Sequence, residues 1–361
     1  MKKLNIYLIA LGLIAFGCDG TYTDDIVPVA PGSDEAAPTV VINFPLEGTQ
    51  IRVPDETTTL NINFVVSDDI EIESVVVRLN GTEILQVSEF LDYRRFVKTF
   101  VHEQLGNGNH VLVIEAKDLS GKSTTETVNF EKVEPYSPVY DNEVFYLPFD
   151  GDYLELVSVE EATIVGSPGF ATAGVVGRAY QGSSSGYLTL PTTGLTNDEF
   201  SAVFWYKVNP SPDRAGILVM GPPDPNNPTN QNFRNHGFRL FREAAGSMQR
   251  IKLNVGNGSG DNWFDGGAAA DIDPSKNEWV HIAFSISGSN VAVYLDGEVV
   301  SQGSFSGIDW TGCDLLSVGS GAPRFSEWGH LSTQSLIDEL RIFNKALTQT
   351  EIQTIIEAEK P

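Results

Sequence analysis

The segment Phe200-Ser201-Ala202-Val203-Phe204-Trp205-Tyr206-Lys207-Val208 decides the fold class of this chain. It contains no glycine or proline, and aromatic and β-branched side chains dominate it, which is typical of a β-strand. Similar short runs, separated by turn residues, lie on both sides of it. They cover residues 143–147, 187–190, 238–242, 250–255, 279–286, 291–295, 315–318 and 336–343.

One segment of the same region predicts a helix. Thr348-Gln349-Thr350-Glu351 has the pattern of a capping box, and Leu347 and Ile352 are spaced as a hydrophobic staple. Parallel sheets need crossover helices between their strands, and the sequence indicates none. The region therefore predicts two packed antiparallel sheets, and the expected fold class of the chain is all-β.

Composition narrows the function classes. The 361 residues include 48 Asp and Glu against 23 Lys and Arg, a formal net charge of −25. Such a charge repels phosphate groups, so no nucleic-acid partner is expected. Two cysteines cannot build a disulfide scaffold or a Cys-rich zinc site. With 41% hydrophobic residues the chain is expected to fold, and its length suggests more than one domain.

The first residues carry a targeting pattern. Met1-Lys2-Lys3 precedes an apolar run from Leu4 to Phe16, which is too short to span a bilayer and suits a secretory signal. The run ends at Gly17-Cys18 and resembles a bacterial lipoprotein signal, which implies removal of residues 1–17 and lipidation of Cys18. An ordinary signal followed by an incidental cysteine is the alternative.

Residues 18–38 are small, acidic and proline-containing, and predict a flexible tether. Acidic residues just after a lipidated cysteine resemble the export tag of surface-exposed outer-membrane lipoproteins. The resemblance implies a protein anchored by lipid to the outer membrane and facing the outside of the cell.

Residues 39–133 contain short alternating runs with turn signals between them, the pattern of a β-sandwich. The run from Ser74 ends at Asn80-Gly81, which is typical of a type I′ hairpin turn. This run, together with residues 67–70 and 108–118, resembles bacterial immunoglobulin-like domains. The resemblance implies that residues 39–133 act as a spacer. Two prolines in the following residues 134–142 resist strand pairing and predict a linker.

Residues 143–361 resemble the laminin-G-like, concanavalin A-like jelly-roll domains of bacterial secreted proteins. The resemblance implies a second β-sandwich, and its strength lies in the order of the matching segments. These are 146–151 (YLPFDG), 174–180 (GVVGRAY), 186–191 (GYLTLP), 200–208, 278–284 (EWVHIAF), 293–298 (VYLDGE) and 335–347 (SLIDELRIFNKAL).

Catalytic motifs are weak in this region. Retaining glycosidases need two carboxylates facing one sugar bond, and those with similar folds use Glu-x-Asp-x-x-Glu. The segment Leu336-Ile337-Asp338-Glu339-Leu340 lacks both flanking glutamates. The letters of Gly182-Ser183-Ser184-Ser185-Gly186 match a nucleophile elbow, but a strand follows where that motif requires a helix. We therefore expect no enzymatic activity.

Calcium is the inorganic candidate, because hard oxygen ligands suit a secreted β-sandwich. Related folds often hold a structural calcium between the first and last strands, and the resemblance implies Asp150 and Asp338 as ligands. In the alternative, Asp150 starts a turn and Asp338 is an outward strand residue. Both interpretations stay open at this stage.

Tryptophans indicate a ligand site. Three of the five lie in polar, glycine-rich segments, and sugars stack on such rings while their hydroxyls bind polar groups. Loop tryptophans that only plug loops onto the sandwich are the alternative. Trp205 and Trp279 lie in predicted strands and are assigned to packing. The candidate binding residues are Trp263, Trp310, Trp328, Phe325, Arg324, His236 and Arg239.

These expectations converge on a non-catalytic protein that binds glycans at the cell surface. It would be similar to the surface glycan-binding proteins of polysaccharide-utilisation systems, with an outer-membrane glycan transporter as a possible partner. An adhesin or structural module that binds a protein is the second hypothesis. A weak glycoside hydrolase or polysaccharide lyase with an unrecognised site is the third.

Overall fold

The computed structural model describes residues 32–360, so the predicted signal, Cys18 and most of the tether lie outside the described residues. Strands dominate, which confirms the all-β class. No helix within residues 32–360 is both long enough and apolar enough to cross a membrane. The chain divides into two compact units. The first contains most residues up to Glu131, and the second contains Gln50–Thr58, Gln104–Gly108 and the chain from Lys132 onward.

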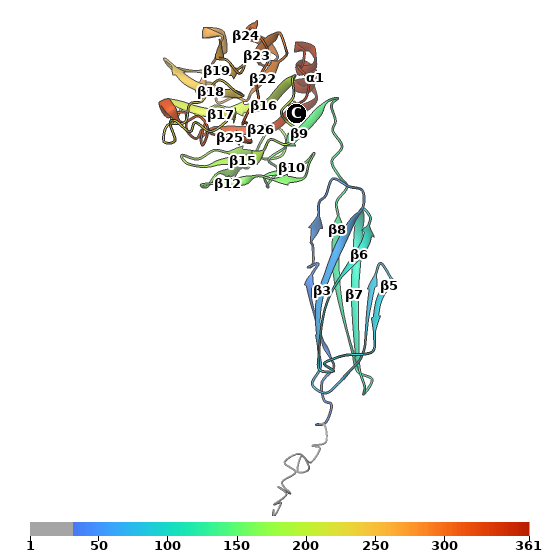
Figure 1. Cartoon of the computed structure of the whole chain (residues 1–361). Helices are drawn as coiled ribbons and strands as arrows, with labels where there is room; N and C mark the ends of the chain where they lie inside the picture. Colours follow the sequence, from blue (N-terminus) through green and yellow to red (C-terminus); the bar gives the residue numbers. More distant parts are fainter. Residues whose placement is uncertain (1–31, 361) are drawn as a thin grey trace, which may run out of the picture. The chain divides into compact units, whose positions relative to one another are not determined.

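The N-terminal strands form two sheets, ordered β1-β3-β6 and β2-β8-β7-β4-β5 (Figure 1). Alternate residues of β3, among them Leu60, Ile62 and Phe64, are buried between them. Asn80 and Gly81 join β4 to β5 with φ of 52° and 80°, the positive values that a type I′ turn requires. The strands are β1 (Thr39–Phe44), β2 (Gln50–Ile51), β3 (Thr58–Ser67), β4 (Ile72–Leu79), β5 (Thr82–Val87), β6 (Arg95–Leu105), β7 (Gly108–Asp118) and β8 (Ser123–Lys132).

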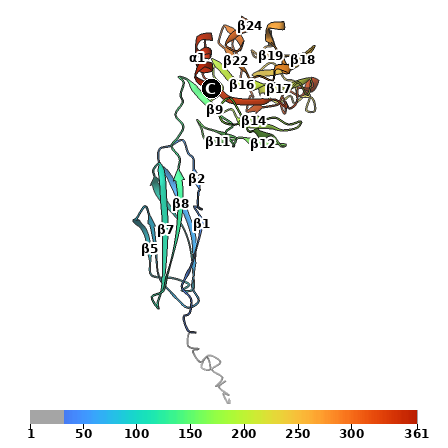
Figure 2. The same ribbon diagram turned by 180° about the vertical axis from the view of Figure 1, so that it is seen from behind.

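The second unit contains two eight-stranded sheets. Sheet I has the order β12-β15-β25-β17-β18-β19-β20, with β21 also paired to β19. Sheet II has the order β13-β14-β26-β16-β22-β23-β24, with β9 also paired to β26. Figure 2 shows the same strands from behind. Two short strands, β10 and β11, form a separate pair.

The strands of the second unit are, in chain order, β9 (Glu143–Leu147), β10 (Leu154–Glu155), β11 (Glu160–Glu161), β12 (Thr163–Val165), β13 (Gly169–Ala171), β14 (Ala179–Gln181), β15 (Tyr187–Pro191), β16 (Phe200–Lys207), β17 (Arg214–Met220), β18 (Phe238–Ala245), β19 (Met248–Gly256), β20 (Asp261–Asp265), β21 (Asp271–Ile272), β22 (Val280–Ile286), β23 (Asn290–Leu295), β24 (Glu298–Ser304), β25 (Leu315–Val318) and β26 (Leu336–Phe343). Its helices are η1 (Gly267–Ala270), η2 (Pro274–Lys276), η3 (Glu327–Gly329) and α1 (Gln349–Glu359).

The main core lies between the two sheets. Side chains such as Phe204 and Phe284 from sheet II pack in one cluster with Leu240 and Leu253 from sheet I. The opposite face of sheet II is covered by α1, whose Ile352 and Ile355 pack on a second cluster. The helix starts with the predicted capping box: Thr348 and Glu351 each accept a hydrogen bond from the other's backbone N–H.

No α-helix covers the outer face of β18, β19 and β20 in the described chain, and only the loop of Phe325 and η3 packs on part of it. Leu240, Leu253 and Phe264 point into the core, so the residues that alternate with them point outward. Strand register sets the outward rows. One row contains Val219, Arg239, Asn254 and Trp263, and the next contains Phe241, Lys252 and Asp265.

Candidate functional site

Two of the three predicted loop tryptophans lie over this outer face with about half of their surface exposed. Trp263 is 44% exposed on β20, and Trp328 is 46% exposed in η3. Each indole rests edge-on against a buried phenylalanine. Trp263 contacts Phe241 at 5.8 Å between ring centroids, and Trp328 contacts Phe325 at 6.2 Å. The rings are therefore anchored from below and open to solvent.

Arg234 connects the two indoles. Its Cζ atom lies 5.4 Å from the ring centroid of Trp263 and 5.2 Å from that of Trp328, within cation–π range. Its Nε atom lies 3.5 Å from Asp261 Oδ2. We call Arg234, Trp263 and Trp328, together with Glu243, Lys252 and Asp265 beside them, the indole surface.

The segment that carries Arg234 is held from beneath by a buried charge. The Arg239 guanidinium is fully buried and donates hydrogen bonds to the carbonyl oxygens of Phe233 and, at 2.7 Å, His236. Burial lowers the pKa of Arg239 to about 10, so it stays protonated at neutral pH. Gly237 follows with φ of 67°, and a Cβ there would overlap the carbonyl oxygen of Met220.

The loop before Arg234 is also tied to the loop that contains Trp328. Gln231 N–H donates to Ser326 Oγ at 3.0 Å, and Ser326 N–H donates to the Gln231 carbonyl oxygen at 2.9 Å. Asn232 donates to the Glu327 carboxylate. Arg234 and Trp328 therefore sit on two loops that are bonded to each other, and loops on a rigid sandwich commonly carry binding residues.

A strip of charged side chains continues the surface beyond Trp263. Lys252 Nζ lies 3.0 Å from Glu243 Oε2 and 3.1 Å from Asp265 Oδ2. Burial opposes the charge on Lys252, but its hydrogen bonds to these two carboxylates raise its pKa overall. Burial likewise opposes the charge on Glu243, yet the hydrogen bond and charge of Lys252 lower its pKa. All three groups are ionised at neutral pH and can bind hydroxyl groups.

The structure places the other predicted residues away from solvent or in other pairs. Trp310 packs on Phe200 and Phe238 in the core, and its Nε1–H donates to the Asn197 carbonyl oxygen at 2.8 Å. It is therefore brought to the core and not to the indole surface. Phe325 is buried behind Trp328.

His236 and Arg324 are each engaged elsewhere. His236 stacks on Phe233, with its Nδ1 atom 2.7 Å from Asp309 Oδ1. Arg324 Nη2 lies 2.7 Å from Asp314 Oδ1.

The sequence prediction missed Glu243, Lys252 and Asp265. Their signal is the alternation of these polar residues with Leu240, Leu253 and Phe264 along three strands.

The two predicted calcium ligands bind one loop. Asp338 Oδ2 accepts hydrogen bonds from Val175 N–H at 2.6 Å and Val176 N–H at 3.1 Å, and Asp150 Oδ1 accepts one from Arg178 N–H at 2.8 Å. Asp338 is fully buried, which corrects the alternative that it is an outward residue. Burial and the nearby charge of Glu339 raise the pKa of Asp338 to about 8.

The donor set fits a cation in part. Asp338 Oδ1 is buried without a hydrogen-bond partner, so it suits either a proton or a metal ion. Within residues 32–360 no group of three or more His, Cys, Asp or Glu side chains is placed to hold a metal. A calcium ion at Asp150 and Asp338 would need backbone carbonyl oxygens as further ligands.

The near match to a glycosidase motif lies in a buried ionic cluster. Arg341 is surrounded by three carboxylates, with Nη1 2.6 Å from Glu143, Nη2 2.8 Å from Glu339 and Nε 2.8 Å from Glu359. Burial raises the pKa of Glu339 to about 7 despite the charge of Arg341. This arrangement binds β9, β26 and α1 together, and Glu339 is engaged inside it.

Comparison with known proteins agrees with this architecture. Residues 181–353 match the family model of the concanavalin A-like lectin/glucanases superfamily. The second unit therefore carries a concanavalin A-like domain. A comparison with curated proteins gives no match.

Similar folds occur among solved structures. One is domain 4 of AbnA, a GH43 extracellular arabinanase from Geobacillus stearothermophilus, solved in complex with arabinotriose. It is 21% identical, with a TM-score of 0.47, over 59% of this chain and 98% of that one. Another is the binding domain of botulinum neurotoxin DC in complex with SialylT, 13% identical with a TM-score of 0.42. There the match spans 61% of this chain and about half (51%) of the toxin domain.

Proposed function

We propose that the chain binds a glycan without cleaving it, and that the indole surface is the binding site. The observation that carries the proposal is the pair of half-exposed indoles, Trp263 and Trp328, connected by Arg234. Sugar rings present apolar C–H faces that stack on aromatic rings. The carboxylates and ammonium of the neighbouring strip would bind the hydroxyl groups.

Charge favours an uncharged glycan. The cationic side chains on and beside the surface already have carboxylate partners: Arg234 has Asp261, Lys252 has Glu243, and Arg250 has Asp271 at 2.6 Å. No unpaired cation among them is available for a uronate or sulfate group, and the net charge of −25 repels polyanions. Binding to a neutral polysaccharide should therefore change little with salt.

Affinity electrophoresis tests the site. The protein is run through gels that each contain one polymer: arabinan, xylan, mannan, β-1,3-glucan, starch or polygalacturonate. We expect one of the neutral polymers to retard its migration. Trp263→Ala and Trp328→Ala should each weaken binding about tenfold or more, equivalent to about 1.4 kcal/mol. Tyr93→Ala is the matched control, because Tyr93 is a 52% exposed aromatic residue in the first unit. Retardation equal to that of the wild type after both tryptophan changes would falsify the site.

The absence of cleavage needs its own measurement. Incubation with the retarding polymer should release no reducing ends. Release abolished by a single carboxylate substitution would make the protein a glycosidase or lyase. Tight capture of a protein, with no retardation by any polymer, would make it an adhesin.

The proposal includes a cell-surface location. Cys18 would be lipidated, residues 18–38 and the first unit would act as tether and spacer, and the glycan would pass to an outer-membrane transporter. The support is the sequence pattern of residues 1–18. Labelling with a radioactive fatty acid should disappear in Cys18→Ala, and protease added to intact cells should remove the wild-type domain.

We also propose a structural calcium at Asp150 and Asp338, supported by the buried, unpartnered Asp338 Oδ1. Calcium in millimolar amounts should raise the melting temperature of the wild type and leave that of Asp338→Asn unchanged. Asp141→Asn, an exposed carboxylate, is the control and should respond like the wild type. An equal response to calcium in all three proteins excludes the site.

A further inference from the structure

A hollow of about 730 Å³ lies at the edge of sheet I that is opposite to β20. Nine of its eleven lining residues come from one stretch, Gly151 to Phe170, and the other two come from Gln50–Thr58 of the same unit. Its volume falls within the range of about 300–1,000 Å³ that small-ligand sites occupy. The nine residues of this one stretch carry the inference.

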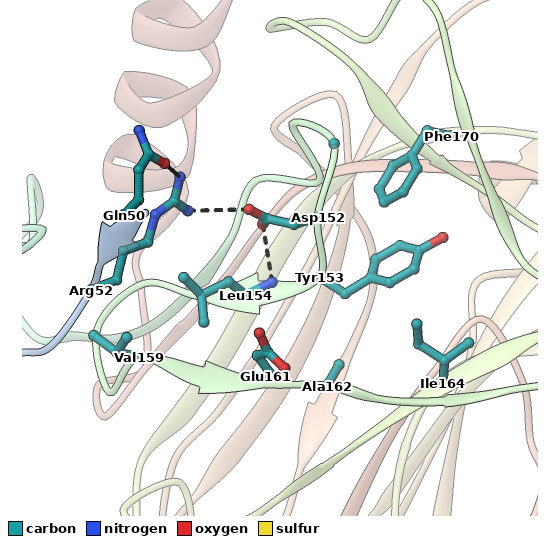
Figure 3. A pocket seen from close by; sticks show the side chains of 11 residues that line it. Gln50, Arg52, Asp152, Tyr153, Leu154, Val159, Glu161, Ala162, Ile164 and Phe170 are labelled. Atoms are coloured by element: carbon teal, nitrogen blue, oxygen red, sulfur yellow. Dashed lines mark hydrogen bonds and ion pairs between the residues drawn. The ribbon is translucent and has the colours of Figure 1, made fainter. Parts of the chain in front are cut away.

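One side of the hollow is apolar and rigid. The rings of Tyr153 and Phe170 stack with centroids 4.4 Å apart and 22° between their planes. The Tyr153 hydroxyl donates to the Gly169 carbonyl oxygen at 3.0 Å, which fixes the ring. Figure 3 shows both rings on the same side of the hollow as Ile164, which is 55% exposed although it is apolar. The apolar part of a ligand should bind on this side of the hollow.

The polar part of the hollow offers acceptors. Glu161 is exposed on β11, and no side chain within residues 32–360 donates a hydrogen bond to its carboxylate. Asp152, the second carboxylate at the rim, already accepts hydrogen bonds from Arg52 Nη1 at 3.1 Å and from Leu154 N–H at 3.2 Å, so Glu161 is the acceptor left for a ligand. Ionised carboxylates only accept hydrogen bonds, so they suit hydroxyl groups and repel uronates and sulfates. An apolar wall of Phe170 and the exposed Ile164, combined with an acceptor for hydroxyls, matches the chemistry of a neutral sugar.

We infer that this hollow is a second subsite for the neutral glycan bound by the indole surface, an inference that rests on the proposed function. Six strand steps separate β12 from β20, roughly 29 Å at about 4.8 Å per step. A polysaccharide long enough to contact both edges of sheet I binds one subsite first, and its binding to the second subsite is then intramolecular. Its affinity for the chain then exceeds that of a short oligosaccharide for either subsite.

Calorimetry on the full-length soluble chain tests the inference. The probes are arabinotriose, xylotriose, mannotriose, laminaritriose and maltotriose, each with its parent polymer. The trisaccharide that binds should bind the wild type at two sites per chain. Glu161→Gln combined with Ile164→Thr should leave one site and lower polymer affinity at least about tenfold. Both residues are exposed, and threonine keeps the β-branch on β12.

Controls separate the two proposals. Glu160→Gln alters the neighbouring exposed glutamate, which does not line the hollow, and should keep two sites. Trp263→Ala with Trp328→Ala should keep the one site in the hollow. One site in the wild type, abolished by the tryptophan changes, overturns the second subsite and leaves the proposed function standing. One site abolished only by the Glu161 and Ile164 changes overturns the indole surface instead. No binding of any probe overturns both.

Discussion

The buried guanidinium of Arg239 donates a 2.7 Å hydrogen bond to the carbonyl oxygen of His236. A second nitrogen of the same group binds the carbonyl oxygen of Phe233, so the charge holds both sides of Arg234. A fully buried cation that donates to carbonyl oxygens is costly to replace, because any change leaves those acceptors unpaired. Arg239 thus positions Arg234 and does not itself meet the ligand.

Arg239→Lys tests this positioning role. Lysine keeps the charge but cannot reproduce the planar donor geometry of the guanidinium. We expect glycan affinity to fall several-fold and the unfolding free energy to fall by about 1–3 kcal/mol. Arg324→Lys changes an arginine whose partner, Asp314, is 69% exposed, and is the control. If Arg239→Lys and the wild type bind the glycan with equal affinity, Arg239 does not position the binding site.

Trp310 and Trp263 should show opposite phenotypes. Trp310 packs in the main core, so Trp310→Ala should lower the unfolding free energy by about 2–4 kcal/mol while the folded fraction binds glycan normally. Trp263 is half-exposed, so Trp263→Ala should weaken binding about tenfold or more but lower the unfolding free energy by less than about 1 kcal/mol. Urea unfolding and affinity gels measure the two effects. All five tryptophans lie in the second unit, so their fluorescence reports on that unit alone.

Sequence patterns could predict the strands whose own residues favour the β conformation. Strands such as Phe200–Lys207 and Leu336–Phe343 were expected, because aromatic and β-branched residues fill them. Arg214–Met220 was missed although it is central to sheet I. The edge strand Asp261–Asp265 was missed because Asp, Asn and Gly surround its tryptophan, and its pairing to Met248–Gly256 overrides that local composition.

The candidate site could be predicted only in part. Loop composition separated Trp263 and Trp328 from the strand tryptophans, but it could not distinguish them from Trp310, whose indole turns into the core. Only the folded chain shows that Arg234 reaches both exposed rings, since the pairing joins loops that are far apart in sequence. The same limit applies to the hollow at Tyr153, Glu161 and Phe170.

Arg341 should be indispensable for stability. Its replacement by methionine leaves Glu143, Glu339 and Glu359 buried without a cation, which should cost about 3–5 kcal/mol. Arg214→Met removes an arginine that is half-exposed in its pair with Glu243 and should cost less than about 1 kcal/mol. Because Arg341→Met alone could fail to fold, Glu359→Gln provides a milder variant. The prediction is contradicted if Arg341→Met and Glu359→Gln both have the same unfolding free energy as Arg214→Met.

His281 should make the second unit sensitive to mild acid. It is fully buried against Trp205, neither ring nitrogen has a hydrogen-bond partner, and burial lowers its pKa to about 3. The unfolded chain binds a proton near pH 6.5, whereas the folded chain does not until about pH 3. Stability is therefore lost as the pH falls through this window, at up to about 1.4 kcal/mol per pH unit.

The test is urea unfolding at pH 7.5 and pH 5.0, followed by tryptophan fluorescence. The wild type should lose about 2 kcal/mol more than His281→Leu between the two pH values, because leucine has no proton to bind. His102→Leu changes a histidine of the first unit and should leave the loss seen by tryptophan fluorescence unaltered. If His281→Leu loses as much stability as the wild type, the acid sensitivity comes from carboxylates, and His281 is protonated in the folded chain.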